Sequence, residues 1–181
     1  AKNLDEFEEV GRKAVRVIVY KGKNKIDTIR EQIGKRGYAV GFEGLIDWIN
    51  GQLPANEEIG RAFRSETRMY PEIAIRELVA NAIIHQDFSE KGFPMIEIFS
   101  DRIEISNPGI PLITPQRFID EYVSRNERLA DVLRRFGICE EKGSGIDKVI
   151  FYNEMCFFIV ILHIAICDFT AFTIQKIISC I

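Results

Sequence analysis

The chain has 181 residues, of which 46% are hydrophobic and 28% are charged, which is typical of a folded globular protein and excludes a disordered one. Its net charge of −3 and pI of about 5.6 exclude a uniformly basic nucleic-acid-binding chain, although they leave room for a local basic patch. No secretory signal opens the sequence, and its cysteines lack the spacing of a zinc or redox motif, so we expect a cytoplasmic protein with reduced thiols.

The first third of the sequence predicts a linker, a strand, a basic segment and a helix. Residues 1–14 are charged and read as the end of a preceding element or a linker, whereas residues 15–20 alternate like a strand. Residues 21–36 are basic and polar, and they are interpreted either as a contact for a phosphate backbone or as a solvated loop with a short helix. Residues 42–53 have a helical apolar period that ends at Pro54.

A second helix, opened by Tyr70 and Pro71, is apolar on most sides but carries one polar stripe. Glu77, Asn81 and His85 are spaced i, i+4, i+8 and therefore project from one helical face. A helix that is apolar on most sides is buried, and a buried amide costs about 2–7 kcal/mol without a partner. The stripe must therefore face either a polar network or a wet functional pocket.

The next segments predict a β-hairpin, a turn and a short helix. Residues 95–99 and 102–106 alternate like paired strands and lead into a turn at Asn107-Pro108-Gly109. Residues 127–136 carry a helical apolar stripe that stops at Gly137. Gly143-Ser144-Gly145 then precedes what reads as another helix. Because residues 151–181 are almost free of charge, we treat them as an atypical hydrophobic tail.

The tail favours a pair of strands around Cys167 and Asp168, or an ill-defined hydrophobic segment, over a membrane span across residues 155–174. Its apolar run stops at Asp168, short of the roughly 20 residues that a membrane helix needs. His163, within the run, reads as a core residue and not as a metal ligand. Apart from this alternative, no membrane partner is expected.

Three polar pieces follow one another along the chain, and each suits a nucleotide pocket for a different reason. A carboxylate such as Glu77 can orient and deprotonate water, and an asparagine such as Asn81 can offer an oxygen to Mg²⁺. A short Asx side chain such as Asn107 can accept a hydrogen bond from an adenine amino group. A glycine-rich loop before a helix lets backbone N–H groups approach phosphates. Each piece alone also has a structural interpretation, as a buried network, a turn or a loop.

This order of motifs resembles the nucleotide-binding boxes of the GHKL superfamily of ATPases. Residues 74–88, 101–109 and 140–149 are more specifically similar to the RecG C-terminal-like ATPase module of Schlafen AlbA-type prokaryotic transcriptional regulators. The resemblance runs from about Arg12 to Ile150, and the nucleotide-binding domain that it implies covers residues 15–150. It implies an α/β (α+β) two-layer sandwich, with a mixed, mainly antiparallel sheet and helices on one face. It also implies an attached N-terminal DNA-binding domain.

The resemblance also implies roles for individual residues. Glu77 matches the general base, Asn81 the Mg²⁺ ligand, and Asn107 and Gly109 the adenine-reading acid and its following glycine. Gly143, Ser144 and Gly145 match the loop beneath the phosphates. A lid would cover residues 115–142, including Arg125 and Asn126.

The expected function is a regulatory module that binds ATP and Mg²⁺, with hydrolysis left open because Asn107 replaces an aspartate. We expect nucleotide to change the lid and thereby alter contacts in a homodimer or with the DNA-binding domain. Two alternatives stay open. The module could be degenerate and only dimerise, or it could bind DNA directly through residues 21–36.

Overall fold

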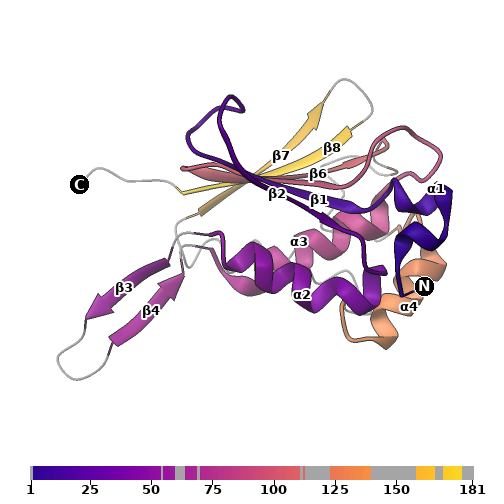
Figure 1. Ribbon diagram of the computed structural model, residues 1–181, viewed down its shortest axis with the longest axis horizontal. Helices are drawn as coiled ribbons and strands as arrows, with labels where there is room; N and C mark the ends of the chain where they lie inside the picture. The colour runs from indigo at the N-terminus through magenta and orange to yellow at the C-terminus, as the bar shows by residue number, and fades with distance from the viewer. Residues whose placement is uncertain are drawn as a thin grey trace.

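The fold is built around a mixed β-sheet with helices packed on one of its faces (Figure 1). The computed structural model describes residues 2–53, 55–59, 64–68, 70–110, 112, 123–139, 158–165 and 169–176. The main sheet has six strands in the order β2-β1-β5-β6-β8-β7, and β3 and β4 form a separate hairpin that projects away from the helices.

The elements follow one another along the chain with these bounds. The N-terminal half contains η1 (Leu4–Glu6), α1 (Glu8–Gly11), β1 (Val15–Tyr20), β2 (Thr28–Gly34), α2 (Tyr38–Asn50), β3 (Ala55–Ile59) and β4 (Arg64–Arg68). The C-terminal half contains α3 (Glu72–His85), β5 (Met95–Ile98), β6 (Arg102–Pro108), α4 (Glu127–Arg135), β7 (Phe158–Ala165) and β8 (Phe169–Lys176). The predicted two-layer α+β architecture, with helices on one face of a mixed sheet, is therefore confirmed.

The sheet is mainly antiparallel, as predicted, because its neighbouring strands pair antiparallel everywhere except between β1 and β5. The hairpin of β5 and β6 pairs Ile96 with Ile105 and Ile98 with Ile103, and these isoleucines face the helices. The hydrophobic core lies between this face and α3, whose apolar side chains are buried along almost the whole helix. α3 is thus the central helix of the domain.

The predicted loop and short helix over residues 21–36 are wrong in part, because residues 28–34 form β2. The side chains of Thr28, Ile29 and Glu31 are all exposed, so the strand lacks the alternation that marks a half-buried strand in a sequence. Pairing with β1 imposes the strand: Arg16 lies opposite Ile33 and Ile18 opposite Glu31. Backbone hydrogen bonds to β1 therefore make this segment a strand, and such bonds cannot be recognised from its composition.

The hydrophobic tail contributes two strands to the main sheet. β7 and β8 pair with each other, and β8 pairs with β6 from Arg102↔Gln175 to Pro108↔Phe169. β6 is therefore a central strand, with β5 on one side and β8 on the other. Among the residues described, no helix has the length and apolar character needed to cross a bilayer.

Candidate functional site

The polar stripe of α3 is present as predicted on an otherwise buried helix. Pro71 stands at the N-cap position and Glu72 in the first turn, as suits the start of a helix. Glu77 is only 4% exposed, whereas Asn81 and His85 are half-buried. A carboxylate is rarely buried to this degree in a core unless it is held by partners or serves a site.

The stripe runs along the side of α3 that lies next to α4. At one end, the Arg125 guanidinium is close enough to His85 to lower the pKa of that imidazole. At the other end, burial raises the pKa of the Cys139 thiol, and the Glu77 carboxylate raises it further. α3 and α4 also pack against each other, so α4 forms one wall beside the stripe.

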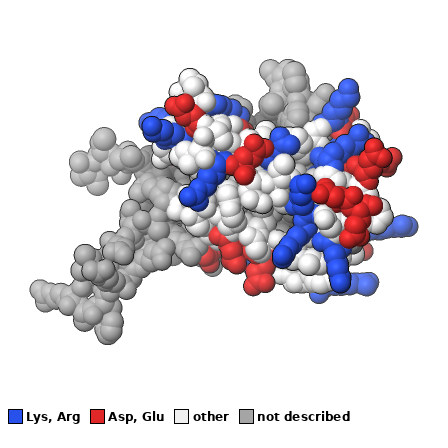
Figure 2. Space-filling view, in the orientation of Figure 1, with Lys and Arg blue, Asp and Glu red and all other residues white. Residues whose placement is uncertain are grey.

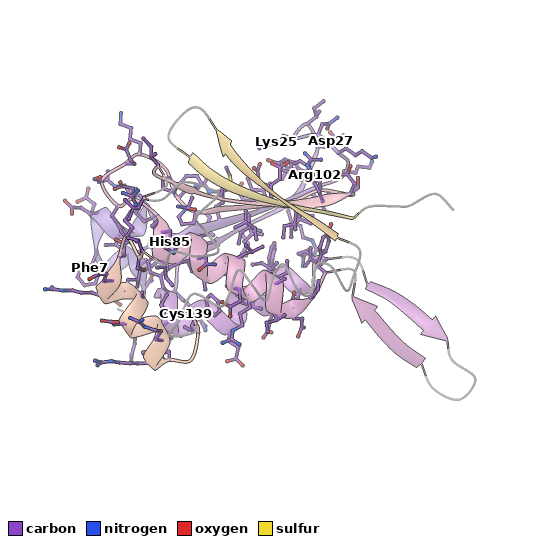
Figure 3. All side chains as sticks on the ribbon, turned by 180° about the vertical axis from the view of Figure 1, so that it is seen from behind. Phe7, Lys25, Asp27, His85, Arg102 and Cys139 are labelled. Atoms are coloured by element: carbon purple, nitrogen blue, oxygen red, sulfur yellow. The ribbon has the colours of Figure 1, made fainter. Side chains whose placement is uncertain are left out.

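His85 is neutral in this arrangement. Burial, and secondarily the positive charge of Arg125, lower the pKa of His85 to about 4. The imidazole therefore carries no proton charge at neutral pH and is a poor general acid there. Figure 3 shows both His85 and Cys139 on the helical side of the sheet.

Asn107 lies on the face of β6 that meets the helices. The expectation that Asn107 begins a turn is wrong, because β6 continues through Pro108 and pairs Asn107 with Thr170 of β8. Asn107 extends the buried alternation of Ile103 and Ile105 and is only 2% exposed. Its Nδ2 atom donates to the Pro108 carbonyl at 3.4 Å, a long bond that holds the amide only weakly.

Gly109 makes a tight approach to the segment after α3. Its φ of +115° is one that residues with a side chain rarely adopt. A Cβ atom at this position would lie 2.8 Å from Cβ of Asp87 and 3.4 Å from its backbone nitrogen. The Asp87 N–H also donates to the Pro108 carbonyl at 2.7 Å. The glycine therefore lets the end of β6 rest directly against the C-terminal end of α3.

Asn81 and Asn107 consequently stand on two elements in contact, since α3 packs on β6. The Asn81 side chain makes no hydrogen bond to any residue that the structure describes, so its oxygen is available to a ligand. No group of His, Cys, Asp and Glu side chains suited to a metal occurs among the described residues. Such a donor set fits Mg²⁺ only if phosphates and water fill most of the coordination shell, as Mg²⁺ commonly allows.

The remaining predicted site residues, Gly143, Ser144 and Gly145, lie outside the described residues. The same holds for most of the expected lid, of which residues 123–139 are described. These include α4, whose C-terminal end is followed by Gly137 at a φ of +67°, as the sequence predicts for a helix stop.

The sequence interpretation missed a polar cluster at the C-terminal end of α3. Arg125 Nη1 donates to Asp87 Oδ2 at 2.7 Å, and Asn126 Nδ2 donates to the carbonyls of Ile84 and Gln86 at 2.6 and 2.8 Å. Asn126 precedes α4 but makes no N-cap hydrogen bond there, and its amide nitrogen donates instead to the end of α3. The sequence feature that could have pointed to this cluster was Asp87, whose side chain forms an Asx turn with Ser89.

Lys13, placed by sequence in the linker, belongs to the same cluster. It is 1% exposed, and its Nζ atom donates to the carbonyls of Asp87 and Glu90 at 3.0 and 2.5 Å. The Lys13 carbonyl accepts a hydrogen bond from the Tyr38 hydroxyl at 2.8 Å. Residues before β1 are therefore packed into the domain.

The opposite face of the sheet carries a different polar cluster. Glu97 is 4% exposed; it accepts hydrogen bonds from the Tyr20 hydroxyl at 3.0 Å and from Lys25 Nζ at 2.7 Å. Burial and the bond to Glu97 raise the pKa of Tyr20 to about 12. Figure 3 shows Lys25 and Arg102 on this face, away from His85. The bond from Lys25 to Glu97 attaches the loop between β1 and β2 to the sheet.

A groove of about 880 Å³ lies between α1, the start of α2 and α4. Phe7, Val40, Val132 and Phe136 line it with exposed apolar surface. None of Glu77, Asn81 and Asn107 is among its described lining residues, but Arg125 and Asn126 are, so this groove adjoins the predicted site only at the start of α4.

The comparisons with known proteins agree with the fold. Residues 92–156 match a family model described as "Putative ATP-dependent DNA helicase recG C-terminal". This match includes β5, β6, α4 and the glycine loop but not α3. No curated protein matches the sequence.

A crystal structure of the DIP2311 protein from Corynebacterium diphtheriae has the same fold. It superposes with a TM-score of 0.79 at 19% sequence identity, over 93% of this chain and 35% of that protein. The chain thus spans about a third of that protein's length, and a likeness at this identity shows the fold alone. Residues 92–156 are similar to the ATPase-like C-terminal module of RecG-type helicases, which indicates a GHKL-like, nucleotide-binding type of module.

Proposed function

We propose that this domain binds ATP with Mg²⁺ between α3, the end of β6 and the segment that contains α4. The observation that carries the proposal is the placement of the buried Glu77 carboxylate and the Asn81 amide on one face of α3, against β6 with its buried Asn107 and the following Gly109. The ATPase-like match over residues 92–156 supports the same part of the chain.

Each residue has a distinct role in this proposal. Asn81 supplies one oxygen to Mg²⁺, whose other ligands are phosphate oxygens and water. Asn107 accepts a hydrogen bond from the adenine amino group, and Gly109 lets the base approach the backbone. Gly143, Ser144 and Gly145 offer backbone N–H groups to the phosphates. Mg²⁺ would supply shielding of phosphate charge when bound, and Glu77 would orient a water molecule and take its proton if hydrolysis occurs.

The regulatory part of the proposal follows from the walls of this site. α4 lies beside the polar stripe and also lines the apolar groove. A nucleotide that contacts both α3 and α4 can shift the position of α4 only if it binds one position more tightly than another. We therefore propose a module whose nucleotide state alters contacts of a transcriptional regulator, either within a homodimer or with an attached DNA-binding domain.

Direct DNA binding through residues 21–36 is less well supported. Lys23 pairs with Asp101 at 3.5 Å, Lys25 with Glu97 at 2.7 Å and Lys35 with Asp5 at 3.2 Å. Figure 2 shows acidic and basic side chains interspersed over the visible face of the described residues. A duplex would have to compete with these acids for the lysines.

Thermal unfolding with a non-hydrolysable ATP analogue tests the binding proposal. At a ligand concentration 100 times Kd, binding adds about 2.7 kcal/mol, which corresponds to a Tm increase of roughly 5–10 °C for a chain of this size. The shift should require Mg²⁺ and disappear in Asn81→Ala. Because this side chain has no described hydrogen-bond partner, the variant itself should unfold near the wild-type temperature.

Two further variants sharpen the test. Glu43→Ala, an exposed change on α2, is the control and should keep the full shift. Glu77→Gln should bind the analogue but lose any hydrolysis that the wild type shows. Absence of a shift in the wild type, or an equal shift in Asn81→Ala, would contradict the proposed role of this site.

A further inference from the structure

Arg125 and Asn126, just before α4, connect the ends of α3 and β6. We call Asp87, Arg125 and Asn126 the clasp. Arg125 uses two arms of its guanidinium: Nη1 donates to Asp87 Oδ2 at 2.7 Å, and Nη2 donates to the Ile110 carbonyl. A planar guanidinium with several fixed donors suits such a two-sided contact better than an ammonium group does.

Asp87 is a rigid anchor for this contact. Its Oδ1 atom accepts hydrogen bonds from the Ser89 N–H at 2.9 Å and from the Ser89 hydroxyl at 2.5 Å. These bonds, together with the charge of Arg125, lower the pKa of Asp87, so the carboxylate is ionised at neutral pH. The ion pair is mostly shielded, because both side chains are 21% exposed.

Asn126 extends the contact to α3 itself. Its Nδ2 atom donates to the carbonyls of Ile84 and Gln86, at 2.6 and 2.8 Å. These carbonyls belong to the last turn of α3, whose carbonyl groups have no partner within the helix. The residue that starts α4 is thus fixed to the end of the helix that carries Asn81.

The arrangement defines the spacing of two walls. One wall is the exit of β6 at Gly109 and Ile110, and the other is the start of α4. The backbone of Asp87 already touches the first wall through the Pro108 carbonyl, and Arg125 spans from Asp87 to Ile110. Without the guanidinium, the described contacts join β6 and the start of α4 only indirectly, each through its own contact with the end of α3; Arg125 adds the direct link between them.

We propose that Arg125 is a positioning residue of the nucleotide site, which holds the exit of β6 and the start of α4 at a fixed separation across the end of α3. This inference rests on the proposed nucleotide function. Arg125 acts through Asp87 and the Ile110 carbonyl, and it does not itself contact the nucleotide. The site is consequently shaped before the ligand arrives, which lowers the ordering cost of binding.

Calorimetric titration with Mg²⁺ and a non-hydrolysable ATP analogue separates positioning from direct contact. We expect Arg125→Met and Asp87→Asn each to weaken binding, by at least about tenfold, as losses of supporting contacts around bound ions commonly do. The double variant should bind no more weakly than Arg125→Met alone, because removal of the guanidinium already breaks the ion pair with Asp87. Arg125→Lys keeps the positive charge but lacks the two donor nitrogens of the planar guanidinium, so its affinity should lie between those of the wild type and Arg125→Met.

Arg134→Met is the matched control, since Arg134 pairs with Asp131 on α4 away from the clasp. It should leave the affinity unchanged. Weaker binding of the analogue by Arg125→Met, together with unchanged or tighter binding by Asp87→Asn, would overturn the proposal. This result would mean that Arg125 contacts phosphate directly. Should Arg125→Met fail to fold, Arg125→Lys and Asp87→Asn still decide between these outcomes.

Failure of this inference is distinguishable from failure of the proposed function. If the wild type does not bind the analogue, the nucleotide function itself is wrong. If the wild type binds and Arg125→Met binds equally well, only the positioning role is wrong.

Discussion

Replacing Gly109 by alanine tests the close approach of β6 to the end of α3. A φ of +115° disfavours a residue with a side chain, at a cost of about 1–3 kcal/mol. The added Cβ would also lie 2.8 Å from Cβ of Asp87, well inside the roughly 3.5–4.0 Å of a favourable carbon contact. Asp87 is held by Arg125 and Ser89 and cannot easily move away, so overpacking adds about 1–3 kcal/mol.

We therefore expect Gly109→Ala to lose about 3 kcal/mol of unfolding free energy in urea titrations followed by circular dichroism. Gly137→Ala is the matched control: its φ is +67°, but an added Cβ would meet no atom within 4 Å. That variant should lose only about 1–2 kcal/mol. Equal losses in the two variants would refute the argument that Asp87 crowds Gly109.

The remaining predictions concern the surroundings of the stripe. Burial lowers the pKa of His85 from 6.5 to about 4, so the unfolded chain binds a proton that the folded chain does not. The unfolding free energy should therefore fall by on the order of 3 kcal/mol as the pH drops from about 6.5 to about 4. Unfolding titrations of His85→Gln should show a flatter dependence of this free energy on pH. The same dependence in His85→Gln and the wild type would mean that another group causes the loss. Asn126→Ala should lose about 1–3 kcal/mol, because two carbonyls at the end of α3 lose their donor, whereas Asn24→Ala, which breaks an exposed bond to Ile26, should lose a few tenths at most. Leu133→Ala removes a side chain that is 0% exposed and should lose about 2–5 kcal/mol, against less than about 0.5 for Val132→Ala next to it, which is 45% exposed; similar losses would mean that α4 does not pack as described.

The elements that the sequence predicted well are those whose buried residues recur with a regular helical or strand period. α3 and the hairpin of β5 and β6 have clear apolar patterns, and the polar stripe of α3 stands out against them. β2 has no such pattern because its side chains from Thr28 to Gln32 are exposed, and its strand depends on β1. Asn107 similarly lies in a strand because β8, far along the chain, extends the ladder of β6.

The clasp could not be predicted for a related reason. Asp87 and Arg125 are 38 residues apart, and nothing in either local sequence identifies the other as its partner. Asn126 was expected only as part of a lid, yet its amide nitrogen donates to carbonyls at the end of α3. The residue types were suggestive, but the pairing arises only when β6 brings the end of α3 and the start of α4 together.

The most direct test of the nucleotide proposal locates the ligand by nuclear magnetic resonance. Adding Mg²⁺ and a non-hydrolysable ATP analogue to ¹⁵N-labelled protein should shift the side-chain amide signals of Asn81 and Asn107 and the backbone signal of Gly109. Signals of the groove, such as the backbone amides of Phe7 and Val40, should change little. Shifts confined to the groove or to the Tyr20–Glu97 face, with Asn81 and Asn107 unmoved, would contradict a nucleotide site between α3 and β6.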